Sequence, residues 1–115
     1  MARIKFKLHK KRSKYNNKLV EHEGWKFHSK LERDLYKHLQ LLKDAGEIGI
    51  ILRQVSLYLV PGLNFVVDFM VQYLDDRRIE FIDAKGYMTT VAKNKIKMAE
   101  HVHGIKIKIV KRGDF

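Results

Sequence analysis

Three central segments of the chain are rich in apolar residues and bounded by turn residues, which is the pattern of consecutive β-strands. We expect strands from Ile50 to Val60, from Leu63 to Tyr73 and from Ile79 to Lys85. Pro61-Gly62 separates the first two, and the run from Leu74 to Arg77 separates the second from the third. Connections this short predict that the three strands pair as an antiparallel meander.

A helix is predicted before these strands. Ser29-Lys30-Leu31-Glu32 matches the capping box, in which a serine at the helix start is followed three residues later by a glutamate. Gly46 is a suitable stop at the other end. Helical spacing places four leucines on one apolar stripe, namely Leu31, Leu35, Leu39 and Leu42.

A second helix and a last strand follow the meander. We expect the helix from about Thr90 to Val102, stopped by His103-Gly104, with its lysines outward. The residues expected to point inward are Val91, Met98 and Val102. Ile105, Ile107 and Ile109 alternate with lysines and predict a strand that a helical crossover makes parallel to the third. The predicted class is α/β, in the order α-β-β-β-α-β, with a mixed four-stranded sheet flanked by helices.

Basic residues are concentrated at the N-terminus. Residues 1–18 contain eight basic side chains and no acid, so they carry most of the net charge of +11. Such a surface favours a polyanion as partner, nucleic acid before any other. The alternative is a solvated tail that only aids solubility. The arm residues expected to bind DNA are Arg3, Lys5, Lys7, Lys10, Lys11, Arg12 and Lys14.

The length of 115 residues predicts one small domain, residues 19–115, behind this N-terminal arm, residues 1–18. Apolar and basic residues alternate from Arg3 to Leu8, a short strand pattern that can add to a sheet edge in this chain or in a partner. At the start of the domain we expect a short strand from Leu19 to Glu23, and we expect Trp25 in the core.

Composition excludes several classes of protein. The chain has no cysteine, which rules out disulfides and thiolate metal sites, and its six histidines lack the spacing of a zinc site. No glycine-rich phosphate loop is present, so no nucleotide cofactor is expected. No apolar run approaches a transmembrane helix and no signal peptide is visible, so we expect a cytoplasmic protein without a membrane partner.

Two acids interrupt apolar strand segments. Asp68 lies within Phe65–Val71, and Asp83 lies within Phe81–Gly86. A buried carboxylate costs several kcal/mol unless it is paired or holds a metal. A hairpin can bring both acids together, where they and the backbone carbonyl of Ala84 suit a hard cation such as Mg²⁺.

Lys85 lies on the same strand face as Asp83, by the alternation of side chains along a strand. Beside a metal, its ammonium can orient the attacking water or stabilise developing charge. The alternative is a structural ion pair between Lys85 and Asp68 or Asp83, which closes a buried polar cluster.

Glu32 is the fourth candidate, with two competing roles. It can cap Ser29 reciprocally, or it can point across the sheet to the metal, and we expect these roles to exclude one another in one conformer. Further DNA-binding candidates on the domain are Lys30, Gln54, Lys93, Lys95 and Lys97, for which a core hydrogen bond (Gln54) or a solvated helix face (the lysines of the second helix) is the alternative.

Glu32, Asp68 and Asp83-Ala84-Lys85, carried on α-β-β-β-α-β, resemble the PD-(D/E)XK nuclease superfamily. The superfamily's usual proline is replaced here, since Val67 precedes Asp68. Phe27–Glu32 and Asp83–Gly86 further resemble small phage-encoded nuclease-like proteins, and the size and basicity are similar to archaeal and phage Holliday-junction resolvases. The resemblance covers roughly residues 24–110.

This resemblance implies a metal-dependent, structure-selective DNA endonuclease with Glu32, Asp68, Asp83 and Lys85 as catalytic residues. The cofactor would be Mg²⁺, with Mn²⁺ as a substitute, and the acids and the Ala84 carbonyl would hold it. Four-way DNA junctions would be nicked symmetrically by a homodimer, in the host cytoplasm if the protein is phage-encoded. The alternatives are another phage-type nuclease of the superfamily and a non-catalytic nucleic-acid-binding module.

Overall fold

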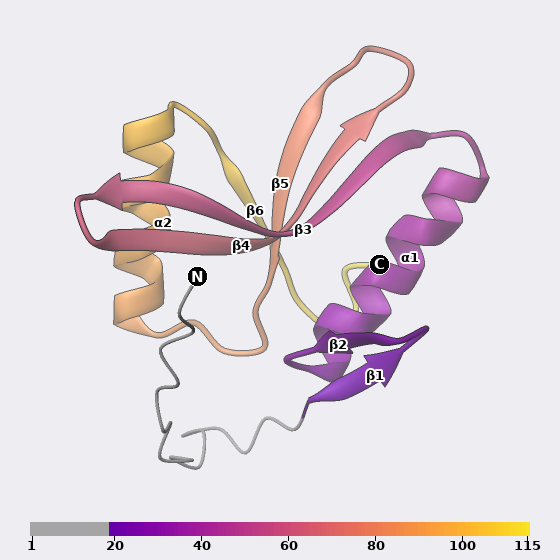
Figure 1. The fold of residues 1–115 in the computed structure, drawn as a ribbon, viewed down its shortest axis with the longest axis horizontal. Coiled ribbons are helices and arrows are strands. Elements are labelled where there is room, and N and C mark those ends of the chain that lie inside the picture. The colour runs from indigo at the N-terminus through magenta and orange to yellow at the C-terminus, as the bar shows by residue number, and fades with distance from the viewer. Residues whose placement is uncertain (1–18) are drawn as a thin grey trace, which may run out of the picture.

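The computed structural model describes residues 19–115, and the expectations for the arm lie outside this range. Within residues 19–115, two helices and six strands follow one another (Figure 1). Their bounds are β1 Val20–His22, β2 Trp25–Phe27, α1 Lys30–Asp44, β3 Ile48–Val60, β4 Leu63–Tyr73, β5 Ile79–Ala84, α2 Thr90–His103 and β6 Ile107–Val110.

The main sheet has the strand order β3-β4-β5-β6. β3 pairs antiparallel with β4, and β4 pairs antiparallel with β5. β6 returns through α2 and pairs parallel with β5. The mixed four-stranded α/β sheet predicted from the apolar pattern is therefore confirmed, with element ends that differ by one or two residues.

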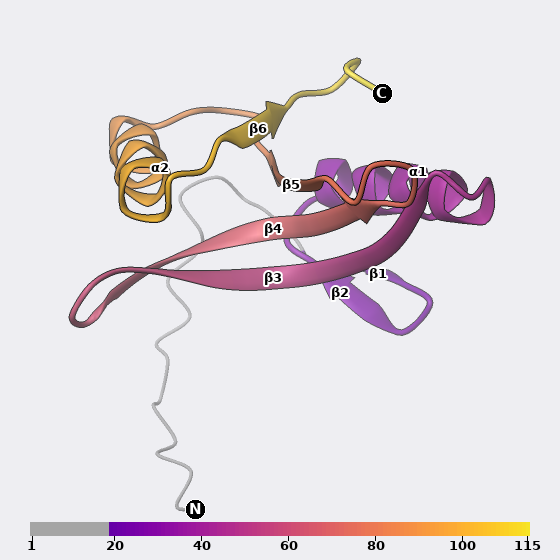
Figure 2. The same cartoon turned by 90° about the horizontal axis from the view of Figure 1, so that it is seen from above.

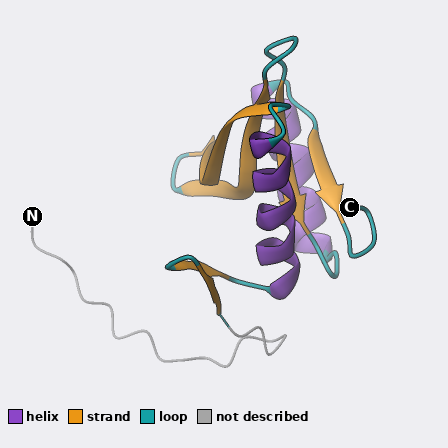
Figure 3. Ribbon diagram, turned by 90° about the vertical axis from the view of Figure 1, so that its right-hand side faces the viewer, coloured by secondary structure: helices purple, strands orange, loops and turns teal. Residues whose placement is uncertain are grey.

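The helices pack on different parts of this sheet. α1 buries Leu35 and Leu39 against Phe69, Val71 and Ile82. α2 covers the end of the β3–β4 hairpin, where its buried residues meet Leu57, Phe65, Val67 and Ile107. Figure 2 shows both helices on one side of the long β3–β4 hairpin, and Figure 3 shows the small β1–β2 hairpin beside the start of α1.

α1 begins and faces the sheet as its sequence predicts. The Ser29 side chain accepts a hydrogen bond from the backbone N–H of Glu32, the first half of a capping box. Leu31, Leu35 and Leu39 are buried, and Leu42 is half-buried against the same cluster. This packing fixes the direction in which the first turn of α1, with Glu32, approaches the sheet.

The inward face of α2 differs from the prediction. Val91, Met98 and Val102, which we expected to point inward, are exposed, whereas Ile96 and Ala99 are buried. Ala99 is completely inaccessible and packs with Ile96 in the core. The prediction chose other apolar residues of the helix, but the helix turns the face with Ile96 and Ala99 toward the sheet.

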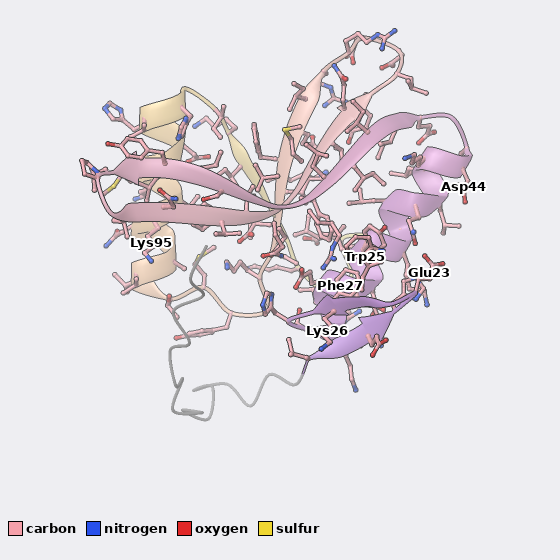
Figure 4. All side chains as sticks on the ribbon, in the orientation of Figure 1. Glu23, Trp25, Lys26, Phe27, Asp44 and Lys95 are labelled. Atoms are coloured by element: carbon pink, nitrogen blue, oxygen red, sulfur yellow. The ribbon has the colours of Figure 1, made fainter. Side chains whose placement is uncertain are left out.

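The N-terminal hairpin contains a strand that the sequence did not reveal. β2, Trp25–Phe27, pairs with β1 across a turn in which Glu23 and Gly24 have φ of 51° and 81°. Trp25 is 54% exposed, so its predicted core position is wrong, and Phe27 enters the core instead. Figure 4 labels these residues beside α1. The hairpin is too short for more than its inner end to reach the core.

No helix in residues 19–115 is long and apolar enough to span a membrane.

Candidate functional site

The four predicted catalytic residues come together from three elements. Glu32 is in the first turn of α1, Asp68 is on β4, Asp83 is on β5, and Lys85 directly follows β5. Glu32, Asp68 and Lys85 line one cleft of about 570 Å³, which extends to the residues before α2. Figure 1 shows α1, β4 and β5, the elements that carry or precede these residues.

The two aspartates occupy the point where β4 and β5 separate. Backbone pairing of these strands ends at Phe69 opposite Ile82. Beyond it, Asp83 Oδ1 accepts a hydrogen bond from the N–H of Asp68 at 3.1 Å, and Asp68 Oδ2 accepts one from the N–H of Ala84 at 2.9 Å. The carboxylates thus satisfy N–H groups that would otherwise lack a partner in the ladder. The strand separation opens the sheet beside both acids.

Lys85 neutralises the more deeply buried aspartate. Its Nζ lies 3.0 Å from Asp83 Oδ2, and the Asp83 side chain is 1% exposed. In residues 19–115 no well-directed hydrogen bond reaches Asp83 Oδ2, so its only close partner among them is this ion pair. A buried oxygen that accepts no hydrogen bond is costly, and a cation relieves that cost. The predicted proximity of Asp83 and Lys85 is confirmed.

Glu32 is also 1% exposed, although it belongs to the first turn of a helix. Its Oε2 accepts a hydrogen bond from the N–H of His28 at 2.9 Å, beside the helix start. Its Oε1 accepts one from Gln54 Nε2 at 2.9 Å, on the cleft side. One conformer therefore contacts both the helix start and the acidic cluster, but the predicted reciprocal bond to Ser29 is replaced by the bond to His28. A carboxylate has two oxygens, and here they face different partners.

Gln54 joins the acids from a third strand. Its Nε2 donates to Asp68 Oδ1 at 3.3 Å as well as to Glu32. Gln54, predicted as a DNA contact or as the donor of a core hydrogen bond, lies within the hydrogen-bond network of the acids.

Arg53 is a site residue that the sequence analysis missed. Its guanidinium stacks on the ring of Phe27 at 4.0 Å and lies 3.7 Å from Glu32 Oε1. Its Nη2 also donates to the carbonyl of Lys26 at 2.8 Å. The sequence contained a sign of this role, because Arg53 lies within a predicted apolar strand. A basic residue there needs a partner as much as Asp68 does.

Burial and like charge act together on Asp68. Burial, followed by the charges of Asp83 and Glu32, raises the pKa of Asp68 from 3.8 to about 8, against the lowering effect of the Ala84 N–H. The two neighbouring carboxylates disfavour the ionised form of Asp68. A divalent cation among them would remove that penalty.

The oxygen atoms of the acidic cluster are suitable ligands for Mg²⁺ or Mn²⁺, but the spacing of the side chains suits a single ion less well. Carboxylate oxygens are the ligands that these hard ions prefer, and Asp83 Oδ2 lacks a hydrogen-bond donor in the described part of the chain. However, no three acidic or histidine side chains in residues 19–115 are close enough to hold one ion as they stand. Binding of one ion by three of these acids would therefore require a local rearrangement of their side chains.

The predicted DNA-binding lysines lie outside the cleft. Lys30 is exposed at the start of α1, and on α2 Lys93 and Lys97 are exposed while Lys95 is half-buried (Figure 4). The cleft reaches α2 through Thr89, whose side chain caps that helix by accepting the N–H of Ala92. His28 and Tyr87 also line it. The seven predicted DNA-binding residues of the arm, from Arg3 to Lys14, lie outside the described residues.

Comparison with known proteins gives one match. The family described as "Protein of unknown function (DUF1064)" matches residues 12–113. Neither the curated proteins nor the solved structures contain a significant match.

Proposed function

The chain belongs to the DUF1064 family, and we propose that it is a metal-dependent DNA endonuclease with a site of the PD-(D/E)XK type. The observation that carries this proposal is the meeting of Glu32, Asp68, Asp83 and Lys85 at the open end of the β4–β5 pair. A helix, a strand and the end of the next strand supply these residues in the order that the resemblance implies.

Each residue has a task that its position supports. Asp68, Asp83, Glu32 and the carbonyl of Ala84 would hold Mg²⁺, for which Mn²⁺ can substitute. The bound ion supplies an acidified water and neutralises negative charge on the phosphate. Lys85 projects from the end of β5 into the cleft, where its ammonium can orient that water or stabilise the charge that develops.

DNA is the proposed substrate because the chain carries a net charge of +11. A four-way junction, cut by a homodimer in the manner of a resolvase, is the specific proposal. Two symmetric nicks need two sites, and one chain of this length supplies one.

A second copy of the chain has an apolar surface available for such a dimer. Large apolar side chains are exposed at alternating positions of β3. Exposed apolar side chains that gather in a patch are typical of interaction surfaces. The residues are Ile50, Leu52, Tyr58 and Val60.

A non-catalytic nucleic-acid-binding module is the alternative, and one observation favours it. Both oxygens of Asp68 and of Glu32 accept hydrogen bonds from the chain itself, and Asp83 Oδ2 is paired with Lys85. Such a network can serve as a structural link between α1, β4 and β5 without a metal.

A cleavage assay separates these functions. Labelled four-way junction, duplex, single strand and RNA are each incubated with the protein, with and without Mg²⁺. We expect Mg²⁺-dependent nicking of the junction in preference to the others. Preferential cutting of duplex or single strands would favour a different nuclease of the superfamily. Binding without cleavage of any substrate, in Mg²⁺ and in Mn²⁺, would favour the non-catalytic module.

A further inference from the structure

Gln54 has an unusual backbone conformation for a residue in the middle of a strand. Its φ is +53°, in the left-handed region that a residue with a side chain enters only at a cost in free energy. The register on both sides is unshifted, since Arg53 faces Phe69 and Val55 faces Val67. The distortion is thus confined to Gln54.

The Gln54 amide lies between two carboxylates. Its Nε2 is 2.9 Å from Glu32 Oε1 and 3.3 Å from Asp68 Oδ1, so one NH₂ group donates one proton to each acid. An electropositive group placed between two carboxylates reduces their mutual repulsion. The Gln54 side chain therefore links the two acids directly.

The same position is where a shared cation would have to lie. In residues 19–115 no three acidic or histidine side chains hold an ion as they stand, although Glu32 and Asp68 face one cleft. The amide nitrogen fills the space that separates their two oxygens. An ion bound by Glu32 Oε1 and Asp68 Oδ1 together must therefore replace the bonds that Gln54 makes to these two oxygens.

We propose that Gln54 is a positioning residue whose amide nitrogen takes the place of the cation in the metal-free site and turns away when a divalent ion binds Glu32 and Asp68. This rests on the proposed function, because the same carboxylates must be the metal ligands. It gives Gln54 two measurable effects: the amide stabilises the metal-free protein, and it competes with the metal for the same oxygens.

The first test uses Gln54→Asn in the full-length chain. Asparagine tolerates the left-handed backbone but carries its amide on a side chain that is one carbon shorter, too short to link both acids. Mn²⁺ binding is measured by calorimetry, and melting temperatures are measured with and without Mn²⁺. We expect a lower melting temperature without metal and Mn²⁺ binding that is roughly five- to tenfold tighter, the factor that corresponds to one net hydrogen bond.

Gln72→Asn is the matched control. Gln72 donates its amide to the carbonyl of Arg77 at 3.0 Å, at the end of β4 away from the cleft. The same change of side chain there should leave the Kd for Mn²⁺ at the wild-type value. A change in Kd for this control equal to that of Gln54→Asn would overturn the proposal, because the effect would not be specific to the site.

Gln54→Lys provides a second, independent test, which decides alone if Gln54→Asn does not fold. An ammonium group at this position should hold both acids, keep the metal-free melting temperature at or above wild type, and abolish Mn²⁺ binding. Wild-type Mn²⁺ affinity in Gln54→Lys, or unchanged or weaker affinity in Gln54→Asn, would overturn the role of Gln54 and leave the nuclease proposal standing. Absence of Mn²⁺ binding in wild type and in Gln54→Asn alike would overturn both.

Discussion

At the scale of single residues, each acid of the cluster accepts hydrogen bonds that hold the fold together and also carries the charge that the proposed metal site needs. Asp68 and Asp83 each bind a backbone N–H of the neighbouring strand, and Glu32 binds the N–H of His28. These bonds fix the carboxylates without consuming every lone pair, since each oxygen can accept more than one donor. Asparagine or glutamine can keep some of these bonds but lacks the charge, so such variants separate the two demands.

Asp68→Asn and Asp83→Asn should abolish cleavage while DNA binding persists. Each removes a charge that would hold the metal, so we expect a loss of at least about 100-fold in single-turnover rate. Binding should persist because the basic surface, and not the cluster, contacts most phosphates. Gel-shift and cleavage assays on one preparation measure both.

Asp44→Asn is the control for this pair, since Asp44 is exposed at the far end of α1 (Figure 4). It makes the same chemical change outside the cleft and should cut normally. Wild-type cleavage by either cluster variant in Mg²⁺ would show that the site assignment is wrong.

The raised pKa of Asp68 predicts a pH-dependent stability of the metal-free protein. The pKa is about 8 in the folded state, against a usual value of 3.8, so between these pH values the folded protein keeps a proton that the unfolded chain has lost. The free energy of unfolding should therefore fall as pH rises from about 4 to about 8 and change little above that. The total effect is on the order of several kcal/mol.

Asp68→Asn should flatten this dependence, because asparagine carries no titratable proton. Denaturant unfolding at pH 5, 6, 7 and 8 in the presence of a chelator measures it. Mg²⁺ should also flatten the wild-type curve, since the ion favours the ionised carboxylate. A wild-type curve that rises from pH 5 to pH 8 without metal would contradict the assigned burial and charge effects.

Glu32→Gln should cut far more slowly than wild type, by about 100-fold or more, the scale of a lost charged group at a reacting centre. Glutamine can still accept a hydrogen bond from the N–H of His28 through its amide oxygen. Its NH₂ group would then face the NH₂ group of Gln54, so two donors would oppose each other and one hydrogen bond would be lost. We therefore expect a modest drop in melting temperature as well. Both quantities are measured on one preparation. A protein that melts earlier but cuts normally would remove Glu32 from the site and leave Asp68, Asp83 and Lys85.

At the scale of elements, helix packing sets the position of the cleft. α1 is held by three leucines over β4 and β5, and α2 approaches the hairpin of β3 and β4 through Ala99. Both helices begin beside the cleft, where Ser29 and Thr89 cap their first turns. A shift of either helix would therefore change the walls of the site as well as the core.

Ala99→Leu tests the observed inward face of α2. The methyl group of Ala99 is fully buried, so a larger side chain must displace the helix or its neighbours, at a cost of about 1–3 kcal/mol. Met98→Leu, at the adjacent exposed position, should change stability by less than about 0.5 kcal/mol. Chemical denaturation of both variants compares them. A larger loss of stability for Met98→Leu than for Ala99→Leu would indicate that the face predicted from the sequence, with Met98 inward, is the correct one.

At the scale of the whole molecule, the acidic cluster belongs to a chain whose net charge is strongly positive. Eight basic residues precede the domain within the first 18 positions, so the arm can supply contacts that the domain surface lacks. Association with DNA should then depend on salt through two regions, the arm and the exposed lysines around the helices.

Deleting residues 1–12 should weaken DNA binding and reduce its salt dependence. The deletion removes six basic residues, and each lost phosphate contact should lower the slope of log K against log salt by about 0.9. Affinities from 50 to 300 mM salt measure that slope. An unchanged slope would show that the arm contacts no phosphate.

Sedimentation of the same deletion variant reports on the dimer. Loss of a dimer would indicate that the segment from Arg3 to Leu8 pairs with a second copy, as its alternating pattern allows. A dimer that survives the deletion would be consistent with pairing through the exposed face of β3 instead.

The sequence by itself determined the order of the two helices and of the four main-sheet strands, the helix start at Ser29 and the presence of acids inside two strands. These features are local: hydrophobic period, turn residues and caps act over a few positions, and they specify which residues a strand or helix contains. The proximity of Asp68, Asp83 and Lys85 also followed, because a short hairpin and strand alternation leave few other arrangements.

Only the tertiary structure decided which side chains share space across elements. Arg53 and Gln54 enter the cluster, Trp25 stays exposed and Ala99 replaces bulkier residues on the inward face of α2. Each outcome depends on the distance between two elements far apart in the chain, which local periodicity does not contain. The contacts of Glu32 are of this kind, because one oxygen accepts from His28 just before its own helix and the other accepts from Gln54 on β3.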